Sequence, residues 1–337
     1  MSSNPITEQI TSRVEEQTGD DTRPVLTYLG PAGTYSHQAA FDRFAKTVHY
    51  RALNTISDVF HSVGPAVHLA LLPQENSIFG IVTETYDLLR SSDVGESRWV
   101  RGAVTLPIQH CLVVRRGKTL RDIKKVLSHE QALGQCQRFL AANLPEAQQV
   151  SVASTAAAAE VVSKQPDAAA DCAAICSKIC LQLFADLELL HEGIQNEHQN
   201  FTRFYILANH PTTPLPNTRY DGRGEFNALI RLELQQKVDE LNASQDSSHP
   251  TVTDLLAALC LPAIRIDRRP SAQHELFGSV YLVEVFDNEA SNASRPSQRV
   301  GEEDVVTGPL PPWKERILDG IARVVARGGR ADLLGTW

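Results

Sequence analysis

The sequence predicts an α/β domain with largely parallel strands, followed by a smaller α+β module. Its 337 residues, 42% hydrophobic and 21% charged, suffice for more than one ordinary core. Between residues 23 and 210, short β-rich runs alternate with helical periods, which is typical of parallel sheets covered by helices. After three prolines between 211 and 216, the order becomes strand, helix, strand, strand, helix, strand.

The α/β part begins with a β-rich run at 25–30, which we expect to be the first strand. Pro31-Ala32-Gly33 then turns the chain into a helix over about 35–46, which a Ser or Thr can cap. Further strands are expected at 68–72, 109–115, 124–128, 173–176 and 204–208, and further helices at 78–89, 131–142 and 155–163.

The α+β module follows an expected linker at 211–225, where prolines and a charged, glycine-bearing segment interrupt the pattern. Its expected elements are a strand at 226–234, a helix at 251–259, strands at 263–267 and 278–286, a helix at 313–326 and a strand at 331–337. This order predicts a small antiparallel sheet with both helices on one face. Such modules commonly pair with a copy of themselves, so we expect a homodimer or a higher homo-oligomer.

Charge and composition exclude several classes of partner. The net charge of −8 repels polyanions and no basic run is present, so nucleic acid is not expected as a partner. The six cysteines form no C-x-x-C pair and no cluster of zinc-binding spacing, so no metal is expected. Residues 1–22 are predicted to be a disordered tail without a signal-peptide pattern, and no stretch approaches the roughly 20 apolar residues of a membrane helix. A cytoplasmic location is therefore expected, with no membrane partner.

Polar side chains gather at three places where a strand is expected to end and a helix to begin, the usual ligand position in open α/β sheets. The segments are Gly30-Pro31-Ala32-Gly33-Thr34-Tyr35-Ser36-His37-Gln38, Pro73-Gln74-Glu75-Asn76-Ser77 and Ser128-His129-Glu130-Gln131-Ala132-Leu133-Gly134-Gln135-Cys136. A fourth, Asn200-Phe201-Thr202-Arg203-Phe204, places a cation beside a hydroxyl at the start of a strand.

Each signal has an ordinary structural alternative. Ser, Thr and Asn at helix starts cap helices more often than they catalyse. Arg203 could form only a surface salt bridge, and Glu75 could order its own loop by bonding a backbone amide. His37, His129 and His191 could act as acid–base groups, although most of the 11 histidines must be ordinary.

Together the four segments resemble the motifs of prephenate dehydratases. Residues 28–40 are similar to the family's opening motif, and 73–77 to its P-x-E-N-S segment. Residues 128–136 are similar to S-H-P-Q-A-L-x-Q-C, and 200–204 to N-x-T-R-F. The motifs occur in order over nearly all of 25–208. Glu130 stands where the family usually has proline, and Gln74 where it usually has an aliphatic residue.

The resemblance implies a periplasmic-binding-protein-like (type II) catalytic domain: two α/β lobes joined by a double crossover, with the substrate in the cleft between them. On this pattern the catalytic domain is 23–210, with lobe one at 23–108 and 191–210 and lobe two at 109–190. The implied reaction converts prephenate to phenylpyruvate, carbon dioxide and water in L-phenylalanine biosynthesis. Because aromatisation makes it strongly downhill, no cofactor is expected. Arogenate dehydratase, or a non-catalytic small-anion-binding protein of the same fold, remain alternatives.

The resemblance also assigns residues to roles. Thr202 would be the principal catalytic hydroxyl, because it can hydrogen-bond a leaving hydroxide as charge develops. The other expected catalytic-site residues are Asn76, Ser128, Gln131, Gln135 and Glu75. The expected substrate-binding residues are Ser36, Thr34, Ser77, Thr155, Arg203 and Phe204.

The module at 226–337 resembles a diverged ACT regulatory domain. Residues 266–270 are similar to the family's I-E-S-R-P, and 334–337 to its closing L-G-[ST]-Y. The resemblance implies feedback by L-phenylalanine, with effector-binding candidates Asp267, Arg268, Arg269, Pro270 and Val252. A polar insertion and His249-Pro250-Thr251-Val252 replace the family's Gly-Ala-Leu turn, whose glycine permits close backbone approach. A domain kept only for dimerisation is the alternative.

Overall fold

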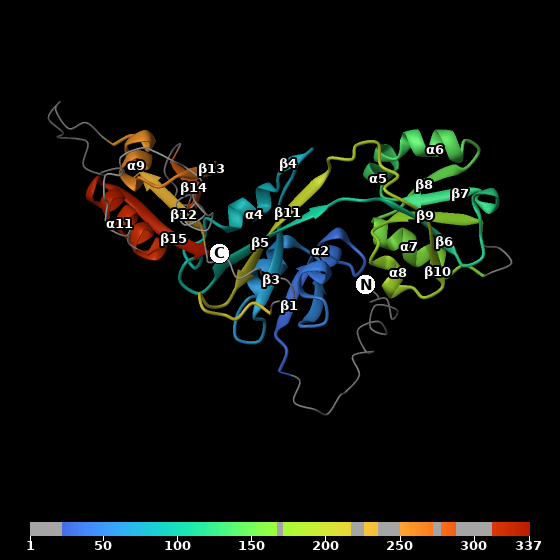
Figure 1. The fold of residues 1–337 in the computed structure, drawn as a ribbon, viewed down its shortest axis with the longest axis horizontal. Helices are drawn as coiled ribbons and strands as arrows, with labels where there is room; N and C mark the ends of the chain where they lie inside the picture. Colours follow the sequence, from blue (N-terminus) through green and yellow to red (C-terminus); the bar gives the residue numbers. More distant parts are fainter. Residues whose placement is uncertain (1–21, 167–170, 217–225, 235–249, 272–277, 288–311) are drawn as a thin grey trace, which may run out of the picture.

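The structure is a computed structural model that describes residues 22–166, 171–216, 226–234, 250–271, 278–287 and 312–337. Within these ranges the chain forms three sheets, which lie in a row in Figure 1: lobe one in the middle, lobe two on one side and the C-terminal domain on the other. This arrangement confirms the predicted two-lobed α/β fold with an added α+β domain. The expected tail and most of the expected linker lie outside the described residues.

Lobe one is a mixed sheet in the order β2-β1-β3-β11-β5, with the short β4 paired to β3. Its strands are β1 (Val25–Leu29), β2 (His49–Leu53), β3 (Leu69–Asn76), β4 (Gly80–Ile81), β5 (Trp99–Pro107) and β11 (Phe201–Ala208). The helices are α2 (Tyr35–Phe44), α3 (Ile56–Ser62) and α4 (Thr83–Leu88). The first three strands run parallel, whereas β11 returns antiparallel between β3 and β5, so this sheet is mixed and not largely parallel as expected.

The expected helix at 78–89 begins only at Thr83, because the residues before it form a turn and β4. The Asn76 side-chain carbonyl accepts hydrogen bonds from the backbone amides of Ile78 and Phe79, at 2.9 and 3.1 Å. This Asx-type turn competes with a helix for the same amides. Gly80 then adopts a φ of 82°, which disfavours helix at that point.

Lobe two is a five-stranded sheet in the order β10-β6-β9-β7-β8. Its strands are β6 (Cys111–Arg115), β7 (Lys125–Ser128), β8 (Gln148–Ser151), β9 (Cys172–Cys176) and β10 (Leu187–Glu192). The helices are η1 (Leu120–Asp122), α5 (Glu130–Gln135), α6 (Gln137–Asn143), α7 (Thr155–Ser163) and α8 (Cys180–Leu183). The expected helix at 131–142 is divided at Cys136, and β10 continues two residues past the expected lobe boundary at 190.

The C-terminal domain is an antiparallel sheet in the order β13-β14-β12-β15. Its elements are β12 (Asn227–Leu234), α9 (Val252–Leu259), β13 (Ala263–Pro270), β14 (Ser279–Phe286), α11 (Trp313–Ala326) and β15 (Gly329–Thr336). Both helices cover the same face of the sheet, and residues from both join its hydrophobic core. The predicted order of elements in this module is therefore confirmed.

The C-terminal domain shares a hydrophobic core with lobe one. Leu229, Leu282 and Leu334 pack in one cluster with lobe-one residues that include Tyr205. At Gly335 the backbones approach so closely that a Cβ would lie 1.9 Å from the Val100 carbonyl oxygen. Only glycine fits such an approach, which gives the closing L-G-[ST]-Y-like motif a packing role.

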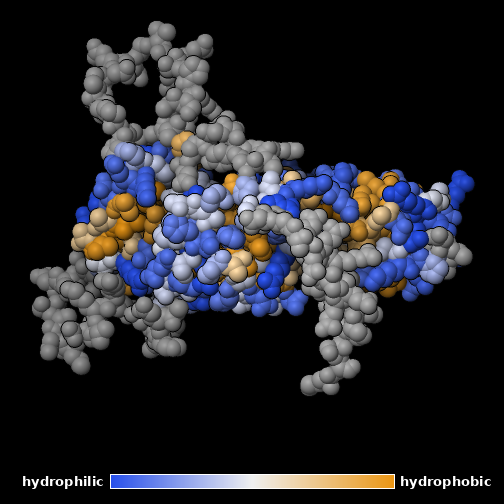
Figure 2. All heavy atoms as spheres, turned by 90° about the horizontal axis from the view of Figure 1, so that it is seen from below, coloured by the Kyte–Doolittle hydropathy of each residue, from blue (hydrophilic) through white to orange (hydrophobic). Residues whose placement is uncertain are grey.

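The face seen in Figure 2 is largely hydrophilic, with separate hydrophobic patches. Among the described residues, no helix combines the length and apolar character that crossing a membrane requires.

Candidate active site

A cavity of about 460 Å³ lies between the two lobes. The two lobes and both crossovers between them contribute to its wall, which is made of Leu29, Thr34, Tyr35, Asn76, Phe79, Ile108, His110, His129, Gln131, Ala132, Gln135, Ser154, Thr155, Asn200 and Thr202. Six of the residues assigned from the motifs therefore share one cavity: Thr34, Asn76, Gln131, Gln135, Thr155 and Thr202.

Asn76 and Thr202 form a fixed pair at one side of this cavity. They lie opposite each other in the antiparallel pairing of β3 and β11. The Asn76 side-chain NH2 donates to the Thr202 hydroxyl oxygen at 3.0 Å and to the Asn200 side-chain oxygen at 2.7 Å. Since the Asn76 carbonyl is held by the turn that follows, the amide is fixed at both ends. The Thr202 oxygen thus accepts one hydrogen bond, and its own O–H can donate into the cavity.

The starts of helices from both lobes also line the cavity. The Thr34 hydroxyl caps α2, and the Ser154 hydroxyl caps α7 by accepting from the Ala157 amide at 3.0 Å. His129 caps the short helix α5, since its Nδ1 accepts from the Gln131 amide at 3.3 Å. Because N-terminal helix dipoles favour negative charge, α2 and α7 suit this cavity to an anionic ligand.

An adjoining cavity of about 330 Å³ extends the site. It shares Phe79, Gln131, Gln135 and Asn200 with the first cavity, and its other lining residues include Arg138 and Glu197. Arg138 is a cation that sequence reasoning missed, because it lies two residues beyond the S-H-P-Q-A-L-x-Q-C-like motif. Among the described residues, no group of three or more His, Cys, Asp or Glu side chains is arranged to hold a metal ion.

Glu75 and Arg203 are not in the wall of either cavity, although they neighbour Asn76 and Thr202. Side chains alternate along a strand, so these two point to the other face of the sheet. The Glu75 carboxylate lies 3.6 Å from the Arg203 guanidinium and forms an ion pair with Arg265 of β13. Arg203 also lies 4.0 Å from the carboxylate of Glu284, which is only 4% exposed. The substrate contact expected for Arg203 is replaced here by contacts with the C-terminal domain.

Four other expected site residues are used in packing. Ser128 is fully buried, and its hydroxyl donates to the Ile175 carbonyl at 2.6 Å, which joins β7 to β9. Ser77 accepts from the Phe201 amide at 2.9 Å and so fastens the turn after β3 to β11. Ser36 is buried in α2, and Phe204 lies in the core of lobe one. A motif fixes which residues are near the site, but only the backbone geometry decides which side chains face it.

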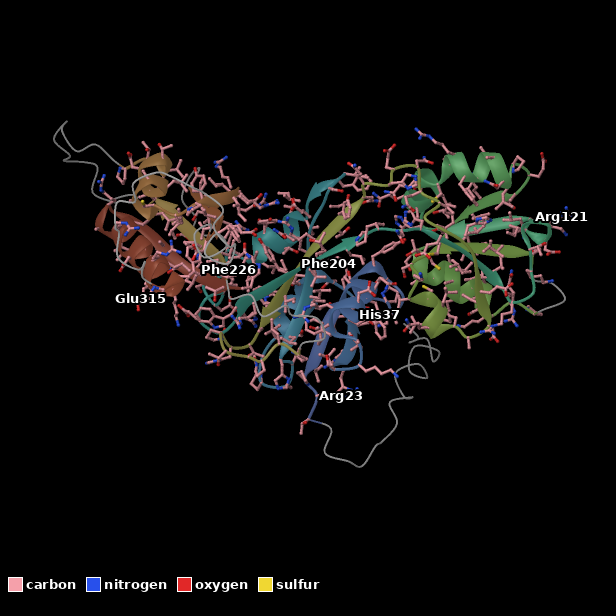
Figure 3. All side chains as sticks on the ribbon, viewed as in Figure 1. Arg23, His37, Arg121, Phe204, Phe226 and Glu315 are labelled. Carbon is pink, nitrogen blue, oxygen red and sulfur yellow. The ribbon has the colours of Figure 1, made fainter. Side chains whose placement is uncertain are left out.

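Of the three histidines considered as acid–base groups, only His129 lines the cavity. His37 is 6% exposed and accepts from the Gly33 amide at 3.1 Å; Figure 3 shows it on the side of lobe one that faces lobe two. Burial lowers the pKa of His37 to about 4. His191 packs edge-on against Phe139, with ring centroids 5.1 Å apart.

The effector-binding candidates form contacts within the protein. Arg269 forms an ion pair with Asp87 at 2.7 Å, and the Pro270 carbonyl accepts from Arg90, so β13 docks on the end of α4. Asp267 pairs with Arg265, and Arg268 donates to the Ser279 hydroxyl. Val252 is the first residue of α9. Among the described residues, none of these five lines either cavity between the lobes or the larger one described next.

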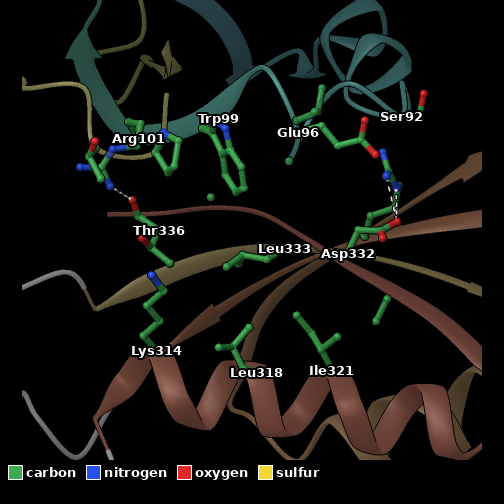
Figure 4. Close-up of a pocket in the computed structure, with 17 residues that line it drawn as sticks. Ser92, Glu96, Trp99, Arg101, Lys314, Leu318, Ile321, Asp332, Leu333 and Thr336 are labelled. Atoms are coloured by element: carbon green, nitrogen blue, oxygen red, sulfur yellow. Dashed lines mark hydrogen bonds and ion pairs between the residues drawn. The ribbon is translucent and has the colours of Figure 1, made fainter. Parts of the chain in front are cut away.

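A larger cavity, of about 740 Å³, lies between lobe one and the C-terminal domain. Figure 4 shows Trp99 on one side of it, with Leu318 and Ile321 of α11 on the other. Its Arg231 is already paired with Asp332 at 2.8 Å. None of the residues expected in the catalytic site lines this cavity, although Gly335 and Thr336 of the closing L-G-[ST]-Y-like motif do, so size alone does not identify the candidate active site.

Tyr35, Phe79, His110, Ser154 and Asn200 line the site although the sequence did not single them out. Tyr35 and Asn200 lie inside the quoted motifs, and Ser154 directly precedes Thr155. Their positions in the sequence could therefore have identified these three as candidate site residues. His110 lies in the first crossover, outside every quoted motif. The sequence gives no sign that a crossover residue would reach the cavity.

Comparison with known proteins places these features in a family. The chain is 35% identical over 190 residues to the bifunctional chorismate mutase/prephenate dehydratase of Aquifex aeolicus, which covers 56% of this chain and 50% of that protein. It is 36% identical over 248 residues to arogenate dehydratase/prephenate dehydratase 1 of Arabidopsis thaliana, with 69% of this chain and 58% of that protein covered. The chain thus spans about half the length of the curated relatives it matches.

A solved structure has the same fold along most of the chain. The prephenate dehydratase of Arthrobacter aurescens, in complex with L-Phe, superposes with a TM-score of 0.63 at 23% identity, covering 93% of this chain and 89% of that one. The family model for prephenate dehydratase matches residues 26–212, which include both lobes and every residue of the candidate active site. The chain therefore belongs to the prephenate dehydratase family.

Proposed function

We propose that this chain catalyses the decarboxylating dehydration of prephenate to phenylpyruvate, carbon dioxide and water. One observation carries the proposal: the Asn76 amide holds the Thr202 hydroxyl in the wall of a cavity between two lobes. These residues occupy the P-x-E-N-S-like and N-x-T-R-F-like positions, and the family model spans both. The role of an enzyme in L-phenylalanine biosynthesis, located in the cytoplasm, fits this chemistry.

The reaction needs little covalent chemistry from the protein. The bond from the ring to its carboxylate breaks, the electron pair enters the ring, and the ring C–O bond breaks as the ring becomes aromatic. The departing hydroxide takes a proton from solvent to become water. The Thr202 O–H is too weak an acid to transfer its proton outright, but it can donate a hydrogen bond to the departing oxygen. Asn76 orients that hydroxyl, so the donor is in place before charge develops.

Binding of the substrate anion is assigned to the helix starts and to Arg138. Prephenate carries two carboxylates, whereas the protein carries a net charge of −8. The α2 and α7 N-termini, at Thr34 and Thr155, offer backbone amides, and Arg138 adds a fixed positive charge next to Gln135. Enclosure between the lobes would desolvate the carboxylate that departs, which favours its loss.

The test is direct: the purified chain is incubated with prephenate, and phenylpyruvate is followed by its absorbance in base. Steady production of phenylpyruvate is expected. A parallel incubation with arogenate, followed by its product phenylalanine, tests the alternative favoured by the name of the Arabidopsis relative. Binding of prephenate without product from either compound would instead support a non-catalytic anion-binding protein.

We further propose that the C-terminal domain regulates the lobes as a diverged ACT domain in a homodimer or higher oligomer, with L-phenylalanine as effector. Its β13 carries the I-E-S-R-P-like segment and contacts β3 through Arg265 and Glu75, one residue from Asn76. Calorimetry with L-phenylalanine, beside an inhibition assay, is the test. Heat of binding together with inhibition is expected, whereas neither would leave the domain a structural role.

A further inference from the structure

A chain of hydrogen bonds crosses the candidate active site from one lobe to the other. The Tyr35 hydroxyl, at the start of α2 in lobe one, lies 2.5 Å from Nδ1 of His110. His110 belongs to the first crossover, and its Nε2 lies 2.6 Å from the side-chain oxygen of Gln135, at the end of α5 in lobe two. All three residues line the cavity.

The directions of these hydrogen bonds follow from the donors available. The Gln135 oxygen can only accept, so Nε2 of His110 carries the hydrogen and donates. In a neutral imidazole the other nitrogen is then an acceptor, so the Tyr35 hydroxyl donates to Nδ1. His110 is only 2% exposed, and burial lowers its pKa, which keeps the ring neutral.

The second crossover holds the backbones of His110 and Gln135 in place. The Gln195 side-chain oxygen accepts from the backbone amide of His110 at 2.9 Å, and the Gln135 carbonyl accepts from the backbone amide of Asn196 at 2.6 Å. These bonds fix the backbones of His110 and Gln135, while the imidazole ring itself is held by the Tyr35 hydroxyl and the Gln135 side-chain oxygen. With the Gln135 oxygen committed to His110, only its NH2 group remains for the cavity.

We propose that His110 is a positioning residue, which holds the Gln135 amide with its NH2 group facing the cavity as a hydrogen-bond donor to the substrate. A freely rotating glutamine would present its oxygen part of the time, and this would repel a carboxylate. The inference rests on the proposed function for its substrate, but the orientation of Gln135 is a property of the protein alone.

A double-mutant cycle tests the proposal through the kinetics of prephenate turnover. His110→Leu is expected to lower kcat/KM about 10-fold or more, as Gln135→Ala should by itself. In the double variant the two losses should not add, so its kcat/KM should lie within about twofold of that of Gln135→Ala. His110→Gln, whose amide NH2 can replace the Nε2 donor, should recover most of the activity. Losses that multiply in the double variant, or no rescue by glutamine, would overturn the role.

Two controls separate this inference from the proposed function and from general damage. His191→Leu removes a histidine of lobe two that lies outside the chain of hydrogen bonds, and it should leave kcat/KM unchanged. Nitrogen-15 NMR of the histidine rings, with His110 assigned by its loss in His110→Gln, should show an Nε2–H tautomer at pH 7. An Nδ1–H tautomer would refute the orientation even if prephenate is turned over. If prephenate is not turned over, the proposed function is wrong, but the NMR spectrum still tests the orientation of Gln135 independently.

Discussion

At the scale of single residues, the alternation of side chains along β3 and β11 decides which motif residues meet the cavity. Asn76 and Thr202 face it, whereas their neighbours Glu75 and Arg203 face the C-terminal domain. The motifs predicted that all four residues lie near one site, because residues adjacent in the sequence must also be close in space. They could not separate the two faces, because the start of β11 was expected three residues later than its observed position at Phe201.

The burial of His37 leads to a prediction about the pH dependence of stability. Its pKa is about 4 in the folded protein, because it is buried, against 6.5 for an ordinary histidine. Between these values the unfolded chain binds more protons, so the free energy of unfolding should fall as pH drops from 6.5 to 4, by up to about 3 kcal/mol from this residue. Thermal unfolding of the wild type and of His37→Phe from pH 7.5 to 4.5 measures this. Equal pH dependence in both would contradict the account.

At the scale of elements, the sequence predicted some helices and strands closely and missed others. The helices at 155–163 and 313–326 were predicted with the observed limits, because alanine-rich and amphipathic patterns are strong local signals. The elements that were not predicted are β2, α3, β4, β5, η1, β8, α8 and β10. Half-exposed strands such as β2 lack a continuous apolar run, so only their pairing in the sheet reveals them.

The contact between the lobes near α2 depends on Gly33, which gives a second prediction. Its φ is 95°, and a Cβ there would lie 3.0 Å from Cys180 Sγ and 3.1 Å from Ala156 Cβ. The Gly33 carbonyl also accepts from the Ser177 hydroxyl at 2.6 Å. Gly33→Ala should therefore lower the melting temperature and weaken prephenate binding.

Gly117 is a matched control for this substitution. Its φ is 80°, but no heavy atom other than its chain neighbours lies within 4 Å of an added Cβ. Gly117→Ala should cost only the backbone strain, about 1 kcal/mol. Calorimetry of both variants separates strain from crowding, and equal losses of stability would show that the inter-lobe contact at Gly33 is unimportant.

At the scale of the whole molecule, a network of charges joins the C-terminal domain to the strands that carry the candidate active site. Glu75 pairs with Arg265, and Arg203 lies between Glu75 and the buried Glu284. Burial raises the pKa of Glu284, whereas Arg203 lowers it. The Tyr205 hydroxyl also donates to Glu284, at 3.4 Å. Such contacts between domains could not be predicted from either segment alone, since they depend on how the domains dock.

Removing Arg265 tests this network. Arg265→Ala leaves the Glu75 carboxylate, which is 25% exposed, with the longer 3.6 Å contact to Arg203 in place of its close ion pair, so it should lower stability by about 1 to 3 kcal/mol and also reduce kcat. Arg268→Ala is the control, because Arg268 is on the same strand and donates to Ser279 within the C-terminal domain. Thermal unfolding measures the stability of both variants, and prephenate kinetics measure their kcat. Unchanged kcat in Arg265→Ala would show that the C-terminal domain does not support the Asn76–Thr202 pair.

The most direct test of the central claim is the turnover number of two Thr202 variants, measured side by side with prephenate. Thr202→Val keeps the shape of the side chain but removes the hydroxyl, so kcat should fall about 100- to 1,000-fold with little change in substrate affinity. Thr202→Ser keeps the hydroxyl and should retain much of the activity. A valine variant that turns over prephenate as fast as the wild type would contradict the account.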